Sequence, residues 1–449
     1  MVRTDEILFK IFRMAIVAIL FIAFNLWFYD HYVLMVRDWS SVLKSLIIID
    51  VALLILIFSV SNYKTLINPV GLYSFFIFAW GYSYLRLSTY QATKYSIYTE
   101  IIIVLTIISF LAGTYWSQPM TALKRAYFSP RLLKVTIFVI ILFCLMAFLS
   151  EIRQIGYFPI FNLSNKNYEH VVQNLIPFVH YFVLFISLVP AILYVYYKSG
   201  IIGKYAYILV MAVSIFALLN MLGRQNLLML GLSFFFAYNY FNKVSNIKIA
   251  LFGCLWVVFF IYMGSVRDDA ETLEIVNSSL KHYSGIFLDT SIFETYLTLY
   301  SSQNFTTLNK IILLSHSNDY FGFGIYTFRP VISFFFIDRI GIIRYDKLYD
   351  GAMQLGTYAL EPFLDFSIIG VILINFIYGR ICITVYNNYI SHKNYFSIIA
   401  WSLVAYCIIM TSFTNYFDTF LIWFALLLSY VALNLKKIKT ENKSGNTLY

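Results

Sequence analysis

The chain is built from long runs of apolar residues, and each run is about as long as a helix that crosses a lipid bilayer. A spanning helix needs roughly 20 predominantly apolar residues, because backbone polar groups in lipid must be satisfied within the segment. The sequence predicts an all-α polytopic membrane protein with about twelve transmembrane helices. These lie near 9–29, 42–60, 69–87, 98–117, 133–150, 174–197, 204–222, 225–241, 247–265, 363–384, 394–413 and 416–435.

Composition supports this fold class and excludes two others. The chain is 61% hydrophobic and only 12% charged, whereas soluble domains carry about 25% charged residues. Its net charge of +10 does not indicate nucleic-acid binding, because the basic residues lie in short connections beside apolar runs. The four cysteines lie inside apolar runs without a metal-binding or disulfide spacing, so we expect no metal and no cofactor.

The distribution of lysine and arginine predicts how the chain is oriented. Cations concentrate in alternate short connections, and such connections face the cytoplasm. Both termini are then cytoplasmic, and residues 267–362 lie outside together with Arg224. This segment has seven Lys/Arg and eleven Asp/Glu, a net charge of −4, which leaves +14 for the rest of the chain.

The chain therefore divides into three parts. Residues 1–266 hold the first nine spans, and 267–362 form one large extracytoplasmic loop. Residues 363–449 hold the last three spans and a basic cytoplasmic tail. Apolar residues recur at near-helical spacing within the loop, so we expect it to contain interfacial helices on the outer membrane face.

Two arginines stand at span ends on the predicted outer side. Arg224 lies in the very short turn between the seventh and eighth spans, directly before Gln225 and Asn226, and Arg267 ends the ninth span. An arginine at such a position often has only a structural role, in which its guanidinium extends to the polar membrane surface. Two on the same side and level can instead clamp a diphosphate, because their forked donors match phosphate oxygens. Gln225 and Asn226 add neutral donors for phosphate or sugar hydroxyls.

Carboxylates near these arginines are candidates for a catalytic base. Asp268 follows Arg267 directly, and a carboxylate there could accept a proton from an attacking hydroxyl. It could also simply pair with Arg267 in a solvated turn. The residues that sequence reasoning leaves as rivals for this role are Glu271, Asp289, Glu294 and Glu361, with His282 and His316 as possible proton shuttles.

One segment of the outer loop combines glycines, aromatic residues and an arginine. It runs Phe-Gly-Phe-Gly-Ile-Tyr-Thr-Phe-Arg-Pro over 321–330 and contains Tyr326 and Arg329. Aromatic faces with polar tips suit sugar rings, so both residues are candidates for substrate binding. Asp50, in the middle of the second span, is the feature that favours a transporter.

Several local motifs resemble those of the O-antigen polymerase (Wzy) family of polysaccharide repeat-unit polymerases. They are Gly223-Arg224 opening a short hairpin, Gly264 to Arg267 before the large loop, Gly156 to Phe161 in an earlier outer loop, and Thr357 to Asp365 with Gly370 at re-entry. The resemblance also covers the overall topology. One motif is absent, because a glycine eleven positions after an outer-loop arginine is replaced by Ser278 after Arg267 and Ile340 after Arg329.

The resemblance implies a metal-independent glycosyltransferase of the bacterial inner membrane whose active site faces the periplasm. Its substrate would be an oligosaccharide repeat unit linked to undecaprenyl diphosphate, and the growing glycan would move to the non-reducing end of a new unit. Arg224 and Arg267 would stabilise the diphosphate, and Asp268 would be the base. Implied partners are membrane lipids and, in the same pathway, a chain-length regulator and a flippase; nucleic acid is not among them.

Three other functions fit the same sequence. An O-antigen ligase would use the same donor with a lipid acceptor, and its sequence requirements hardly differ. A flippase or transporter of lipid-linked oligosaccharides should have paired interrupted helices in two matching halves. A non-catalytic assembly partner should tolerate loss of both arginines.

Overall fold

The structure is a computed structural model in which every described regular element is a helix. The described residues are 39–89, 95–115, 130–161, 170–221, 223–267, 301–317, 322–334, 356–391 and 394–434. No strand occurs among them. The expected first span at 9–29, and residues 268–300, 318–321 and 335–355 of the expected outer loop, lie outside these ranges.

The helices follow the predicted apolar runs closely. Each predicted range from the second to the last coincides with a helix or a helix pair. The α-helices are α2 Trp39–Tyr63, α3 Pro69–Thr89, α4 Ile97–Tyr115, α5 Pro130–Ile155, α7 Val179–Phe185, α8 Val189–Lys198, α9 Lys204–Asn220, α10 Arg224–Asn242, α11 Asn246–Arg267, α14 Gln303–Ser317, α15 Arg329–Phe334, α16 Leu360–Ile390, α17 Phe396–Ile409 and α18 Phe420–Asn434; the short 3-10 helices are η2 Pro159–Phe161 and η5 Met410–Ser412.

Apolar length identifies several of these helices as candidate membrane spans. Among the described residues, four helices are long and apolar enough to cross a bilayer, and α7 with α8 forms a fifth if this bent pair is one span. Shorter apolar helices are found at Lys204–Asn220, Asn246–Phe259, Phe396–Ser412 and Phe420–Leu433. The architecture is that of a helical membrane protein, and twelve crossings stay a prediction.

The bundle is held together where small residues let helices approach closely. α4 and α16 meet at Gly113 and Gly379, where a Cβ on either glycine would lie 2.1 Å from a carbonyl oxygen of the other helix. Small residues permit this backbone contact in membrane bundles. Nearby, the Tyr73 hydroxyl on α3 lies 2.6 Å from the Tyr358 hydroxyl. The glycine contact joins α4 to the middle of α16, and the tyrosine pair joins α3 to the segment just before α16 begins.

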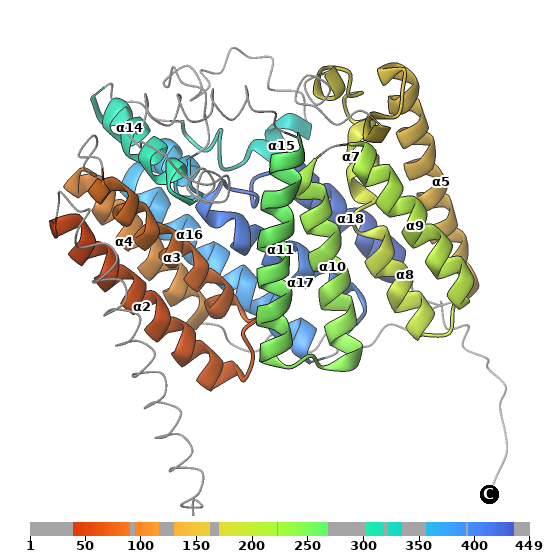
Figure 1. The fold of residues 1–449 in the computed structure, drawn as a ribbon, viewed down its shortest axis with the longest axis horizontal. Coiled ribbons are helices and arrows are strands. Elements are labelled where there is room, and N and C mark those ends of the chain that lie inside the picture. The colour runs from red at the N-terminus through yellow and green to blue at the C-terminus, as the bar shows by residue number, and fades with distance from the viewer. Residues whose placement is uncertain are drawn as a thin grey trace, which may run out of the picture.

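The connections divide between the two ends of the bundle (Figure 1). The turns α2–α3, α8–α9 and α10–α11 lie at one end, and the sequence puts Lys64, Lys198, Lys204, Lys243 and Lys248 in or beside them. The α9–α10 turn, which precedes Arg224, lies at the opposite end with α14 and α15. Alternate connections thus share an end, as the alternating cationic flanks require.

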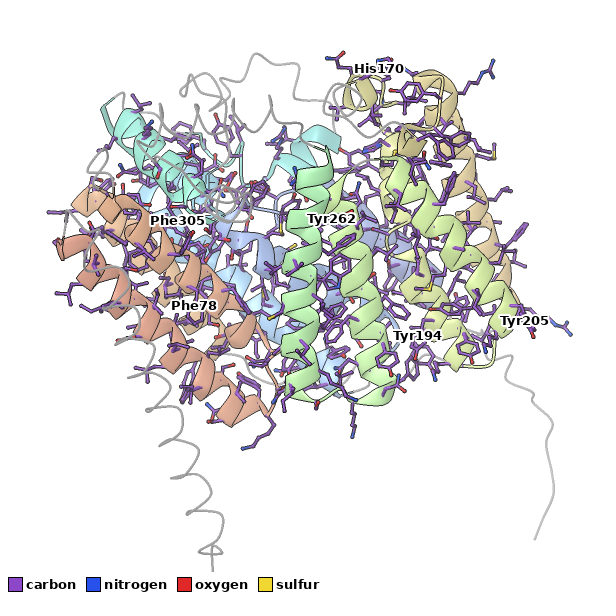
Figure 2. The ribbon with its side chains drawn as sticks, viewed as in Figure 1. Phe78, His170, Tyr194, Tyr205, Tyr262 and Phe305 are labelled. Carbon is purple, nitrogen blue, oxygen red and sulfur yellow. The ribbon has the colours of Figure 1, made fainter. Side chains whose placement is uncertain are left out.

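Helix α14, from the expected outer loop, packs directly on the bundle. Its Phe305, which is labelled in Figure 2, is fully buried. The ring lies 5.4 Å from that of Phe76 on α3. The Asn309 side-chain oxygen accepts hydrogen bonds from the Ser96 N–H at 2.9 Å and the Thr99 hydroxyl at 2.8 Å. This part of the segment therefore packs against α3 and against the beginning of α4.

Two helices are interrupted where the sequence analysis predicted continuous spans. The predicted span 174–197 is instead the pair α7 and α8, bent by 45°. Pro190 explains this break, because it lies in the first turn of α8 and proline cannot continue a preceding helix. α16 breaks at Phe366 and Ser367, where Ser367 has φ 54° and ψ −144°, and no proline stands at that point.

Candidate functional site

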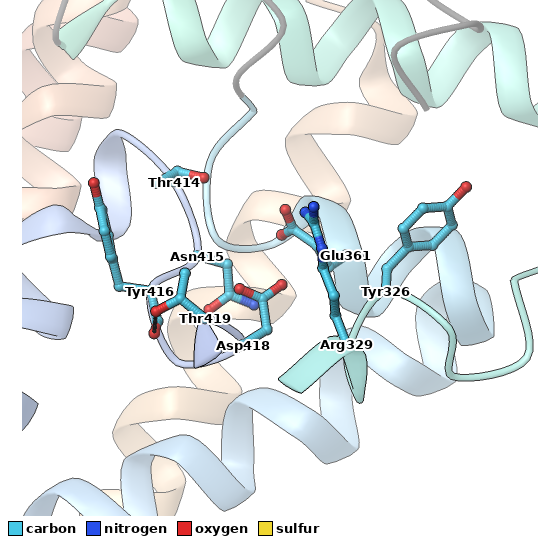
Figure 3. A pocket seen from close by; sticks show the side chains of 8 residues that line it. All are labelled: Tyr326, Arg329, Glu361, Thr414, Asn415, Tyr416, Asp418 and Thr419. Atoms are coloured by element: carbon cyan, nitrogen blue, oxygen red, sulfur yellow. Dashed lines mark hydrogen bonds between the residues drawn. The ribbon is translucent and has the colours of Figure 1, made fainter. Parts of the chain in front are cut away.

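A cavity of about 210 Å³ lies at the end of the bundle that carries α14 and α15. Three segments form it: the α15 region, the first turn of α16, and the connection 413–419 between η5 and α18. The lining residues are Tyr326, Arg329, Glu361, Thr414, Asn415, Tyr416, Asp418 and Thr419 (Figure 3). Each of these eight side chains carries a polar group.

The connection 413–419 is held in shape by its own polar groups. The Asn415 side-chain oxygen accepts the Phe417 N–H at 3.2 Å, and the Thr419 hydroxyl donates to the Tyr416 carbonyl at 2.9 Å. Trp423 on α18 donates its indole N–H to the Phe417 carbonyl at 3.0 Å. Asn and Thr favour such compact turns through side-chain to backbone bonds, so Asp418 is fixed facing the cavity.

Glu361 enters the cavity from the first turn of α16. The preceding backbone is anchored, because the Tyr358 N–H donates to the Thr411 carbonyl at 3.0 Å. Glu361 is only 6% exposed, and its Oε2 atom has no hydrogen-bond partner among the described residues. A buried carboxyl oxygen without a partner is costly and is available to a ligand hydroxyl.

The arginine of the cavity comes from a short segment that we call the strap, residues 322–328, which leads into α15. Strap residue Tyr326 and the first residue of α15, Arg329, both line the cavity. In Figure 3 the side chains of Arg329 and Glu361 are directed to the same region, with Asp418 beside them. Among the described residues, no carboxylate lies within salt-bridge distance of Arg329.

The electrostatics of the cavity raise the proton affinity of Asp418. Burial raises the pKa of Asp418 well above the ordinary carboxyl range, the neighbouring Glu361 raises it further, and Arg329 opposes the shift. A carboxylate with a raised pKa is a stronger base than an ordinary carboxylate once it has lost its proton. No group of three His, Cys, Asp or Glu suited to a metal ion occurs in the described part of the chain. The arrangement suits proton transfer beside a fixed cation.

The Arg224 turn adjoins this cavity through one hydrogen bond. The Tyr416 hydroxyl donates to the Gln225 side-chain oxygen at 2.6 Å, and Tyr416 lines the cavity. Arg224 and Asn226, at the start of α10, are 7% and 4% exposed. No side chain caps this helix end, where the preceding residue is Gly223. A buried guanidinium beside a helix N-terminus favours negative charge.

The structure brings some of the predicted site residues together. Tyr326 and Arg329 line one cavity, and Gln225 bonds to a third lining residue; Arg224 and Asn226 are buried beside Gln225. Arg267 ends α11, but the structure does not describe its side chain. The pairing of Arg224 with Arg267 therefore stays a prediction. Asp268 and its rivals Glu271, Asp289 and Glu294 lie outside the described residues, whereas Glu361 lines the cavity.

Sequence reasoning missed Asp418 and the whole connection 413–419. A signal was present, because Asn415 to Thr419 is a polar interruption that contains a carboxylate. It lies where the predicted span 394–413 ends and the predicted span 416–435 begins. A carboxylate at a span boundary is a candidate for function, just as Asp50 is inside a span. Asp50 lies on α2, and the cavity lining does not include it.

No protein-family model, curated protein or solved structure matches this chain.

Proposed function

We propose that this chain is a membrane glycosyltransferase that polymerises oligosaccharide repeat units carried on undecaprenyl diphosphate, in the manner of the O-antigen polymerase family. The observation that supports this best is the polar cavity in which Arg329, Glu361 and Asp418 meet beside the Arg224 turn. A lipid-linked diphosphate sugar requires cations for the phosphates, a base for the acceptor and access from the membrane surface.

The proposed topology has twelve spans in the bacterial inner membrane, with both termini in the cytoplasm. The end with α14, α15 and the cavity then faces the periplasm, where flipped repeat units are found. The lysine-rich turns at the opposite end support this orientation through the positive-inside rule.

The proposed reaction transfers the growing glycan from its diphosphate to a hydroxyl of a new repeat unit. The ionised form of Asp418, assisted by Glu361, accepts the hydroxyl proton, the oxygen attacks the anomeric carbon, and the bond from that carbon to the diphosphate oxygen breaks. The electron pair leaves with undecaprenyl diphosphate. Arg329 and Arg224, with the N-terminus of α10, stabilise that developing charge. Asp268 and Arg267 remain additional candidates for these two roles.

The size of the cavity suggests which part of the substrates it holds. Water occupies about 30 Å³ per molecule in the liquid, so the cavity of 210 Å³ has the volume of about seven water molecules. This is room for one sugar ring but not for a complete lipid-linked unit. We therefore place the reacting acceptor sugar in the cavity, against the hydroxyls and amide of Thr414, Asn415 and Thr419. The diphosphate lies at the Tyr416 side of the cavity, between Arg329 and Arg224.

Purified protein in lipid, given only lipid-linked repeat units, tests the function directly. A ladder of products identifies a polymerase, and a product formed only when a lipid acceptor is added identifies a ligase. Arg329→Ala should lower the rate of ladder formation roughly a hundredfold to a thousandfold. Arg153→Ala is the matched control, because Arg153 is an exposed arginine at the end of α5 and is not part of the cavity lining.

Further variants test the predicted diphosphate site. Arg224→Lys retains the charge but removes the forked donors, so full activity in this variant would argue against bidentate phosphate binding. Arg267→Ala should leave single repeat units unpolymerised. If expressed Arg267→Ala and Arg329→Ala variants both made glycans of normal length, the chain would instead be a non-catalytic assembly partner.

A transporter is the second candidate, and the break in α16 favours it. In transporters the carbonyls freed by an unwound helix coordinate substrate or ions. Here the Leu364 and Asp365 carbonyls accept the Gly322 and Phe323 N–H groups, so protein already fills those positions. Movement of fluorescent lipid-linked units across vesicles without any ladder would favour the transporter over the polymerase.

A further inference from the structure

The break in α16 is occupied by the strap. The Gly322 N–H donates to the Leu364 carbonyl at 2.8 Å, and the Phe323 N–H donates to the Asp365 carbonyl at 3.2 Å. An unbroken helix would use both carbonyls for its own next turn. The break at Phe366 and Ser367 therefore creates two acceptors, and the strap supplies the donors from about 40 residues earlier in the chain.

The Asp365 side chain doubles this attachment. One carboxylate oxygen accepts the Tyr326 N–H at 3.2 Å, and the other accepts the Thr327 N–H at 2.6 Å. Asp365 is fully buried, and hydrogen bonds are stronger in the low-dielectric interior than in water. The approach is close, because a Cβ on Gly322 would lie 2.4 Å from an Asp365 carboxylate oxygen.

These bonds fix the two residues that the strap delivers to the cavity. The Phe328 N–H donates to the Gly324 carbonyl at 2.9 Å, and the Arg329 N–H donates to the Tyr326 carbonyl at 3.3 Å. Tyr326 is thus bonded both to Asp365 and to the backbone of Arg329. Glu361 precedes Asp365 by four residues on the same helix, a spacing that puts both on one face.

We infer that Asp365 is a positioning residue, which holds the strap in the break of α16 and thereby sets Arg329 at a fixed place relative to Glu361 and Asp418. The inference deepens the proposed function and rests on it for what Arg329 binds. The strained backbone of Ser367 is consistent with such a role, because sparsely populated conformations persist where surrounding contacts enforce them. Asp365 itself does not line the cavity.

The first test replaces one acceptor by a donor. The Asn side chain of Asp365→Asn has only one oxygen acceptor, whereas Tyr326 and Thr327 each present a backbone N–H. The strap therefore loses at least one of its two hydrogen bonds to this side chain. We expect kcat for ladder formation to fall on the order of a hundredfold with little change in KM, whereas Glu100→Gln retains wild-type kcat. Glu100 is the matched control because it pairs with Lys44 on α2 and is not part of the cavity lining.

A double-mutant cycle separates positioning from a general loss of structure. If Asp365 acts through Arg329, Arg329→Ala with Asp365→Asn is no slower than Arg329→Ala alone, because the effects are not additive for coupled residues. Losses that multiply would overturn the inference. Gly322→Ala is a second variant for the case that Asp365→Asn does not fold, because it displaces the strap while the carboxylate remains.

A distance measurement tests the attachment without any activity. Spin labels at Val331 and Ile108, which are 56% and 57% exposed, are attached in a Cys254→Ser background, since Cys254 is exposed and the other three cysteines are buried. Pulsed electron resonance should give one narrow distance in the parent, a broad distribution in Asp365→Asn and an unchanged one in Glu100→Gln. A narrow, unshifted distance in Asp365→Asn overturns the inference even if the chain proves not to be a polymerase.

Discussion

The two interrupted helices differ in how their backbone groups are satisfied. Between α7 and α8 the chain makes i to i+3 bonds, with the N–H groups of Ile186, Ser187 and Leu188 donating to carbonyls three residues back at 3.1, 3.1 and 2.9 Å. This is a 3-10 type turn that closes on itself. In α16 the acceptors at the break are Leu364 and Asp365, and their donors come from the strap.

The difference separates a bend that serves packing from one that shapes the cavity. Ser187 at the α7–α8 bend is fully buried, and its backbone carbonyl accepts the Ser233 hydroxyl of α10 at 3.1 Å. That bend only joins neighbouring helices. The α16 break instead recruits a segment that brings Tyr326 and Arg329 to the cavity. In α16, the donors that fill the break therefore also bring side chains to the cavity.

Two buried glutamates give the strongest test of this comparison. Glu361 lies at the α16 end, whereas Glu151 on α5 is bonded to His180 of α7, with 3.1 Å from the imidazole Nδ1 to each carboxylate oxygen. Glu361→Gln should lower ladder formation roughly a hundredfold to ten-thousandfold, the range for a group that assists proton transfer. Glu151→Gln should reduce the thermal midpoint while leaving kcat within about twofold, because Glu151 bonds to His180 on α7 and to the Ile176 N–H before it and is not part of the cavity lining.

Rates and unfolding midpoints of the two variants, measured in the same lipid preparation, decide between these outcomes. Equal losses of kcat in Glu361→Gln and Glu151→Gln would remove the functional distinction between the two regions. A stable, inactive Glu361→Gln protein beside an active, less stable Glu151→Gln protein supports it.

Glycine substitutions test the strap with a smaller expected effect. Gly324 has φ 92°, and a Cβ there would lie 3.0 Å from the Phe328 ring; Gly200, in the α8–α9 turn, has φ 69° and open space around it. Both Gly→Ala variants force an L residue into a left-handed conformation, at about 1–2 kcal/mol. Only Gly324→Ala should also slow ladder formation, on the order of tenfold, because it shifts the strap. Comparable rates in the two variants would contradict the role of the strap.

Much of the fold could be predicted from apolar length alone, since helices occupy each predicted range from 42–60 onwards. The bend between α7 and α8 could also be predicted, because Pro190 lies inside the predicted span 174–197. The α16 break was not, because neither Phe366 nor Ser367 favours a break. It depends on bonds to the strap, and such tertiary contacts leave no local pattern.

The site was predictable where one segment carries its own signal. The glycine and aromatic pattern around Tyr326 and Arg329 indicated a binding segment, and both residues line the cavity. Asp418 and Glu361 come from segments more than 50 residues apart, and no spacing rule joins them. The pairing of Gln225 with Tyr416 spans 191 residues. Only packing brings these groups to one place.

Acidity gives a third test, centred on the cavity. Because the folded chain raises the pKa of Asp418, it binds that proton more tightly than the unfolded chain does. The stabilisation is complete below the ordinary carboxyl pKa and is lost as pH rises through the raised value, with a slope of up to about 1.4 kcal/mol per pH unit. Asp418→Asn should therefore gain stability relative to the parent as pH rises. The measurement is the unfolding midpoint of both proteins as a function of pH, starting at about pH 4, the ordinary carboxyl pKa. Parallel curves for the two proteins would show that Asp418 is not buried as described.

The smallest effect is expected at the α7–α8 bend itself. The Ser187 hydroxyl donates to the Leu184 carbonyl at 2.7 Å, and Ser187→Ala removes only that bond, worth about 0.5–1.5 kcal/mol. The bend should persist, because Pro190 and the backbone bonds of the 3-10 turn remain. Unfolding should show a slightly lower midpoint, and ladder formation should stay at the parent rate. A loss of rate as large as that of Gly324→Ala would mean that the α7–α8 bend also shapes the cavity. The two breaks would then not differ in function, although the donors come from the bend itself in one case and from the strap in the other.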